Sequence, residues 1–175
     1  MPVDTCKVAG RRSLHFNSLA DINADLDFLA AKKVHALGNW TPGQIYRHLA
    51  TSMTIAIDGA SFTIPWPMRL LSRLFMKKRL QNKPMPPGFQ LPKSAANQLL
   101  PAPTDEKEGL EAFRHALKRM QIETKRAPSP FLGELTREEC DKVQCRHAEL
   151  HLSFLVPEEA LSPVHSPLER TSILP

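Results

Sequence analysis

Two histidines, His147 and His151, stand four residues apart in a segment with helical periodicity. At 100° per residue they lie about 40° apart around a helix axis, so both imidazoles point to the same side. Imidazole nitrogen is a preferred ligand of zinc and related divalent metals, which bind it at about 2.0–2.1 Å. This pair therefore supplies two of the ligands that a metal site needs.

A third histidine, His48, lies on the apolar stripe of another predicted helix. Three imidazoles from two facing helices would hold a divalent metal and leave a fourth position open for water, as a catalytic site requires. The ordinary alternatives are a hydrogen-bonded core histidine at position 48 and a common core or surface pair at 147 and 151. Burying three imidazoles together without a metal or partner would be costly, which favours the metal site.

Other polar side chains near this pair are less suited to metal chemistry. Glu149 lies between the two histidines but points about 180° away from Cys140 on the inward face, which predicts a poor ligand or base. Cys140 itself is expected to be a small buried hydrophobic residue. Gln144 is either a hydrogen-bond partner of a ligand or a polar residue at the core boundary. His115 is expected to face solvent on a different helix.

Four segments with helical periodicity must position these side chains. Thr41-Pro42-Gly43-Gln44 combines a capping box with proline at the first helical position, and Thr136 begins a second capping box. Ser18 and Thr104 are the predicted N-caps of the other two helices. The predicted segments are 18–38, 41–59, 105–126 and 136–155.

Proline and charge mark a long connector between the second and third helices. Eight of the sixteen prolines lie between positions 65 and 103, and the chain from Asp58 to Asp105 carries seven basic and no acidic residues between those two aspartates. The sequence of residues 68–80 predicts a short basic amphipathic helix within this connector. We expect a solvated face whose basic side chains cover apolar surface. A membrane-surface helix and a lid that attracts an anionic substrate are the alternatives.

Length and composition favour a single helical domain. The chain has 175 residues, of which 42% are hydrophobic, 6% are aromatic and only seven are glycine, which disfavours a sheet-rich fold. We expect an all-α four-helix bundle over residues 1–156, with a long proline-rich basic crossover between helices two and three. A mobile proline- and serine-rich tail is expected over 157–175. With three cysteines, no secretory signal and no apolar span, the expected location is cytoplasmic.

Two motifs resemble the DinB/YfiT-like metalloenzyme superfamily. They are Trp40-Thr41-Pro42-Gly43-Gln44-Ile45 followed by His48-Leu49, and His147-x-x-x-His151. The similarity covers roughly residues 12–156, and the stretches at 85–92 and 130–136 resemble a branch known only as a domain of unknown function. The resemblance implies that the three histidines bind a divalent metal, often nickel or zinc. It also implies a four-helix bundle with a long crossover, frequently dimeric.

The expected function is that of a metal-dependent enzyme acting on a small molecule, by hydrolysis or by transfer of a low-molecular-weight thiol. Characterised relatives in the superfamily include thiol-dependent transferases and isomerases, but the crossover and tail of this chain depart from the pattern, so the substrate does not carry over. A homodimer is compatible with the resemblance, whereas nucleic acid and a membrane surface are not expected partners. Two alternatives stay open. One is a non-enzymatic module with structural histidines, whose basic segment 69–83 binds a partner or membrane; the other is a purely structural metal site.

Overall fold

The computed structural model describes residues 2–88 and 93–160 of the chain. This part is mainly helical, as the all-α prediction requires, with one small two-stranded sheet that the prediction lacked. None of its helices has the length and apolar character needed to cross a bilayer. In chain order the elements are η1 (Thr5–Lys7), α1 (Leu19–Ala30), β1 (Val34–Ala36), α2 (Pro42–Asp58), α3 (Trp66–Phe75), α4 (Lys77–Asn82), α5 (Lys93–Leu99), α6 (Glu106–Ile122), α7 (Arg137–Leu152), β2 (Leu155–Pro157) and η2 (Glu158–Ala160).

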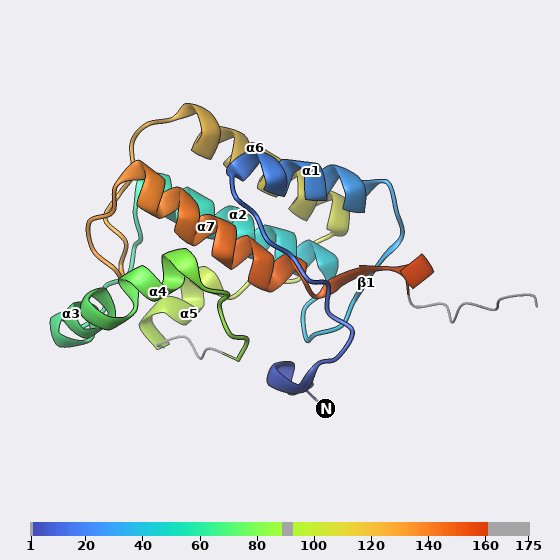
Figure 1. Ribbon diagram of the computed structural model, residues 1–175, viewed down its shortest axis with the longest axis horizontal. Coiled ribbons are helices and arrows are strands. Elements are labelled where there is room, and N and C mark those ends of the chain that lie inside the picture. Colours follow the sequence, from blue (N-terminus) through green and yellow to red (C-terminus); the bar gives the residue numbers. More distant parts are fainter. Residues whose placement is uncertain (1, 89–92, 161–175) are drawn as a thin grey trace, which may run out of the picture.

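The four long helices α1, α2, α6 and α7 share one hydrophobic core (Figure 1). Each contributes apolar residues at three- and four-residue spacing, so that one stripe of every helix faces the others. The aromatic rings of Tyr46 on α2 and Phe113 on α6 stack inside it with centroids 6.4 Å apart. Its most deeply buried members include Ile22, Leu26, Leu49, Met53, Phe113, Leu117, Met120 and Leu152.

Side-chain caps fix where these helices begin. Thr41 and Thr136 each form the predicted capping box with the third residue of the helix, and Ser18, predicted as an N-cap, forms a capping box as well. For α6 the predicted cap was wrong, because Asp105 rather than Thr104 is the N-cap. The Asp105 carboxylate accepts hydrogen bonds from two backbone N–H groups of the first turn, whereas the Thr104 hydroxyl donates to a carbonyl upstream of the helix.

Three helices end earlier than their periodicity predicts. α1 ends at Ala30 instead of Gly38, and α7 ends at Leu152 instead of Leu155, because the chain beyond each helix forms the antiparallel pair β1–β2. α6 ends at Ile122, four residues before the predicted end. Residues 157–160, which the prediction assigned to the tail, belong to β2 and η2; the rest of the predicted tail lies outside the described residues.

Helices α2 and α6 run parallel. At their N-terminal ends Gly43 lies against Gly109, and a Cβ on either glycine would collide with the backbone of the facing segment. Toward their C-terminal ends Asp58 pairs with Arg119 at 2.7 Å. A parallel pair needs a connection that returns along the molecule, which explains the long crossover (residues 59–105) between them.

The crossover contains three short helices instead of the single predicted helix over 68–80. α3 and α4 divide that segment at Met76, and α5 was not predicted. α4 lies against α7, where Lys77 pairs with Glu139 at 2.9 Å. α5 lies against α2 through contacts of Leu99 with Ile55. The crossover therefore covers the side of α2 and α7 on which the three histidines lie.

Candidate metal centre

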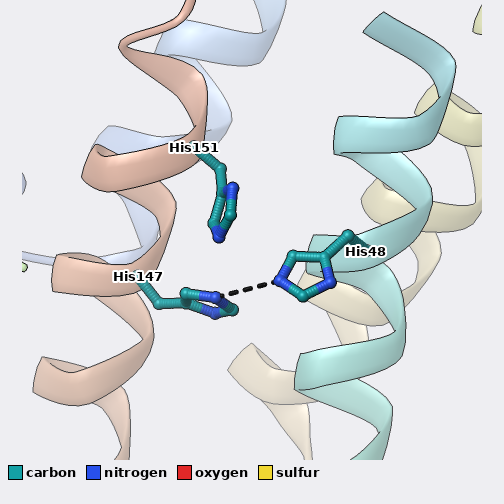
Figure 2. Close-up of side chains that lie close together, drawn as sticks. All are labelled: His48, His147 and His151. Carbon is teal, nitrogen blue, oxygen red and sulfur yellow. Dashed lines mark hydrogen bonds between the residues drawn. The ribbon is translucent and has the colours of Figure 1, made fainter. Parts of the chain in front are cut away.

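The three candidate histidines meet between two helices. Figure 2 shows His48 extending from α2 toward His147 and His151 on α7. Their ring centroids are 4.5–5.0 Å apart, and one ligand atom from each lies within 4.8 Å of the others. The helical spacing predicted that His147 and His151 share one face of a helix and that His48 faces inward. The fold brings His48 and His147 together although they are 99 positions apart in the sequence. This group could hold a metal ion.

The separation of two imidazole nitrogens fits a shared cation. Nε2 of His48 lies 3.1 Å from Nε2 of His147. Two nitrogens bound tetrahedrally to one zinc ion at about 2.0–2.1 Å would be about 3.3–3.4 Å apart. Only a small adjustment of either ring is needed for both to bind the same ion.

A backbone carbonyl fixes the tautomer of His48. Its Nδ1 lies 2.7 Å from the carbonyl oxygen of Leu99, and a carbonyl can only accept. Nδ1 therefore carries the proton and donates it to Leu99. The lone pair is left on Nε2, the nitrogen that faces the other two rings.

A hydroxyl and an amide orient His147 in a similar way. Nδ1 of His147 lies 3.1 Å from Oγ of Ser52, and the Ser52 hydroxyl donates to Oε1 of Gln144 at 3.3 Å. With that hydroxyl proton directed to Gln144, Ser52 accepts from Nδ1–H and Nε2 keeps its lone pair. Figure 2 draws the 3.1 Å contact between the two Nε2 atoms as a hydrogen bond, whose donor depends on the tautomers of the rings; with both Nδ1 atoms protonated, a cation or a further proton must lie between the Nε2 atoms.

The third imidazole is positioned by stacking. The Trp40 indole lies nearly parallel to the His151 ring, with centroids 5.4 Å apart and an interplanar angle of 13°. The same indole touches the His48 ring at 4.9 Å. Trp40 precedes the N-cap of α2, so the residue that leads into the helix also forms one wall of the site.

All three imidazoles are held in the neutral form that binds metals. Burial lowers the pKa of His48. Burial, with a smaller effect of the neighbouring His48, lowers the pKa of His147 to about 3. Burial, the other two histidines and the charge of Arg11 lower the pKa of His151 well below its ordinary value. Near neutral pH no proton competes with a cation for these nitrogens.

A protein-family model matches nearly all of the described part of the chain. Residues 8–158 match the family described as "Protein of unknown function (DUF1569)". The chain belongs to this family. Comparisons with curated proteins and with solved structures give no match. All three histidines and Trp40 fall within the DUF1569 match, and its description names no activity.

Other candidate residues of this DUF1569 chain lie away from the centre. Among the described residues, no aspartate, glutamate, cysteine or further histidine joins the group of three. Glu149 is buried on another side of α7 against Arg146, in agreement with its predicted direction. His115 is exposed. Cys140 is buried, and burial raises the pKa of its thiol to about 11, as expected of a small hydrophobic residue rather than a ligand.

Three contacts of the DUF1569 site were not anticipated. Ser52 stands four residues after His48 on the same face of α2, so its spacing was a usable signal. Trp40 was interpreted only as fixing the start of the helix. The Leu99 carbonyl gives no signal in the sequence, because its place depends on how the crossover folds back.

Proposed function

We propose that this chain is a metal-dependent enzyme of the DinB/YfiT-like type that acts on a small molecule, by hydrolysis or by transfer of a low-molecular-weight thiol. His48, His147 and His151 hold its divalent ion, zinc or nickel, both of which suit imidazole ligands. The observation that carries the proposal is the arrangement of the ring nitrogens, from which we infer the direction of the protons. Leu99 and Ser52 take up the Nδ1 protons of His48 and His147, so that both Nε2 lone pairs point at one position.

The ligand number favours a catalytic ion over a structural one. Structural zinc sites use four protein ligands, whereas catalytic sites use three and leave a position for water or substrate. The described part of the chain offers three. When bound there, a divalent ion supplies Lewis acidity and lowers the pKa of a coordinated water or thiol.

A fixed positive charge stands close to His151. The Arg11 guanidinium donates to Oγ of Ser153 at 2.7 Å and to the Leu150 carbonyl at 3.3 Å, and it lies 4.1 Å from the centre of the Phe154 ring. Its charge contributes to the lowered pKa of His151. A cation held in this way stabilises negative charge that develops on a reacting group, as hydrolysis and thiol transfer both require.

The fold supports the same assignment. Helices α1, α2, α6 and α7 around one core, with α2 parallel to α6, are the arrangement expected of a four-helix bundle with a long crossover. α5 of the crossover reaches the centre directly through the Leu99 carbonyl. We therefore expect the crossover, which departs most from the superfamily pattern, to determine which substrate is accepted.

Metal content of purified protein tests the site. We expect about one divalent ion per chain in the unmodified protein, and a loss of that ion in each of His48→Ala, His147→Ala and His151→Ala. The exposed histidine variant His115→Ala is the matched control and retains the ion. Unchanged metal content in all three site variants would refute the centre.

Activity and folding separate an enzyme from a structural site. Chelation should abolish turnover of ester, amide or thiol-acceptor substrates while the helical circular dichroism remains, and added metal should restore turnover. Unfolding on chelation would instead indicate a structural ion. A protein that binds metal, stays folded without it and turns over no substrate in either class would contradict the enzymatic proposal.

A further inference from the structure

Helix α3 turns its apolar side chains to solvent. Leu71, Leu74 and Phe75 are 59%, 67% and 72% exposed, and Met68 is 50% exposed. No residue of the helix is buried. A helix of an ordinary soluble domain buries its apolar stripe against the core, so this arrangement is the reverse of the usual one.

The polar side of α3 faces the body of the protein. At 100° per residue Met68, Leu71 and Phe75 fall within an arc of about 60°, and Arg69 and Arg73 lie about 130–170° from its centre. Those two arginines line a cavity of about 450 Å³ together with the 128–134 loop. Both arginines remain exposed at the edge of this cavity, which Trp66 and Leu70 also line, and the apolar arc faces away from it.

The apolar arc of α3 has no cover in the described structure. α3 is the outermost helix of the crossover, next to α4 and beyond α7 (Figure 1). Among the helices it packs mainly against α4. The exposed side chains thus lie on a helix at one end of the molecule (Figure 1).

Basic residues outnumber acidic ones around this surface, where Glu134 lines the same cavity as Arg69 and Arg73. Of the basic residues on α3, α4 and the turn after them, only Lys77 forms an ion pair with a described residue, Glu139. Those without such a pair are Arg69, Arg73, Lys78, Arg79 and Lys83. No acidic residue lies between Asp58 and Asp105 to offset them.

We propose that α3 and α4 dock this protein onto the surface of an anionic lipid bilayer. The arc of Met68, Leu71 and Phe75, with Leu74 beside it, enters the boundary between headgroups and acyl chains, while the exposed Lys78, Arg79 and Lys83 contact anionic headgroups. An apolar face of this kind with basic residues around it is typical of helices that lie in the membrane plane. This proposal is independent of the metal centre.

Charge complementarity selects the bilayer over a second copy of the chain. A second copy would bring another set of the same unpaired positive charges to the contact, whereas an anionic surface neutralises them. Each lysine or arginine near such a surface strengthens binding by about fivefold. The sequence pattern alone does not favour a membrane, because it does not show that the apolar side faces outward.

Vesicle sedimentation of the full chain tests the proposal. We expect binding to vesicles of phosphatidylcholine mixed with phosphatidylserine, weaker binding to phosphatidylcholine alone, and a decrease with added salt. The variant Leu71→Ser/Leu74→Ser/Phe75→Ser should reduce the partition coefficient at least about tenfold. Ile122→Ser, which changes an exposed apolar residue at the end of α6, is the matched control and binds like the unmodified protein.

A second variant separates lipid docking from other causes. Lys78→Gln/Arg79→Gln/Lys83→Gln should weaken binding to the anionic vesicles by about fivefold per charge. Absence of binding to anionic vesicles, or binding that the serine variant leaves unchanged, would overturn the proposal. A dimer in solution that the serine variant converts to monomer, without vesicle binding, would assign α3 to a second copy instead. Circular dichroism and metal content confirm that each variant is folded.

Discussion

Helix α7 carries two polar clusters that face different sides of the protein. On one side Arg146 and Glu149, both less than a tenth exposed, form an ion pair at 2.5 Å. On the other side His147 and His151 face α2. The two clusters alternate along the same two turns of helix, yet they meet their hydrogen-bonding needs in opposite ways.

The ion pair finds its partners within the protein. Glu149 accepts from the backbone N–H of Phe16 at 2.5 Å, and Arg146 donates to the carbonyl of the same residue. The opposite charges cancel, and both side chains bind the N-terminal segment to α7. Nε of Arg146 is buried there without a hydrogen-bond partner, but the charges of the pair balance, so we assign the cluster a structural role.

The histidine cluster is not closed in this way. Its donors point outward to Leu99 and Ser52, and its acceptors point inward at one another. Nε2 of His48 and Nε2 of His147 face each other at 3.1 Å while Nδ1 of each ring has a partner outside the cluster, and nitrogens arranged in this way can be completed by a cation. The comparison therefore teaches that the burial of polar groups does not by itself indicate a metal site. The balance of hydrogen-bond donors and acceptors within the cluster is the better indicator.

The largest effect is expected from breaking the ion pair. Arg146→Leu leaves the Glu149 carboxylate buried without its partner, which should lower the free energy of unfolding by about 3–5 kcal/mol in urea denaturation. The double variant Arg146→Leu/Glu149→Leu removes both charges and should lose less. The folded fraction of either variant should still bind metal. A single-variant loss below about 1 kcal/mol would show that the carboxylate is well solvated.

Bound metal should stabilise the protein through the histidine cluster and not through the Arg146–Glu149 ion pair. At a free zinc concentration of one hundred times the dissociation constant, the free energy of unfolding should rise by about 2.7 kcal/mol. Arg146→Leu should show the same increment from a lower baseline, whereas His151→Ala should show none. An increment that survives in His151→Ala would place the bound ion elsewhere on the protein.

Acid should weaken the metal-free protein through the histidines. Their folded pKa values lie below the ordinary value of about 6.5, so the unfolded chain binds more protons as the pH falls. The stability contributed by the neutral imidazoles is present above pH 6.5 and is lost toward the folded pKa, which is about 3 for His147. Each such histidine contributes a slope of up to about 1.4 kcal/mol per pH unit in that window.

Replacing one imidazole checks the source of this acid sensitivity. His147→Asn should flatten the dependence of urea midpoints on pH between about 6 and 4, because asparagine does not titrate. His115→Ala should leave it unchanged, since that side chain is exposed. An equally steep dependence in His147→Asn would assign the effect to other groups.

The starts of the long helices and the inward faces of the three histidines could be predicted because they depend on local spacing. The capping boxes at Thr41 and Thr136 set the phases of α2 and α7, and those phases direct His48 and His147 inward. Helix ends were less predictable. The apolar periodicity predicts a helix that continues through Val34, but the structure has the strand β1 there. The backbone groups of this segment form hydrogen bonds with the distant strand β2 instead of within a helix.

The environment of the three histidines could not be predicted, because it depends on tertiary contacts. Nothing near Leu99 in the sequence shows that its carbonyl meets an imidazole 51 positions away. The direction of the α3 apolar face, away from the cavity that Arg69 and Arg73 line, is also a tertiary property. Spacing identifies the groups on each helix face, but only the fold shows which partners they meet.

Of these changes, replacing Ser52 should have the smallest effect on the free energy of unfolding, but it should clearly lower the affinity for metal. Ser52→Ala removes the acceptor of the His147 Nδ1 proton, which should lower metal affinity by about 10–100-fold, as loss of a hydrogen-bond partner of a ligand does elsewhere. Thr51→Ala is the matched control: its hydroxyl donates to the Arg47 carbonyl on the same helix, so affinity should not change. Equal affinities of the two variants in competition with a chelator would mean that the His147 tautomer is not set by Ser52, and that the cluster is less organised than the ion pair beside it.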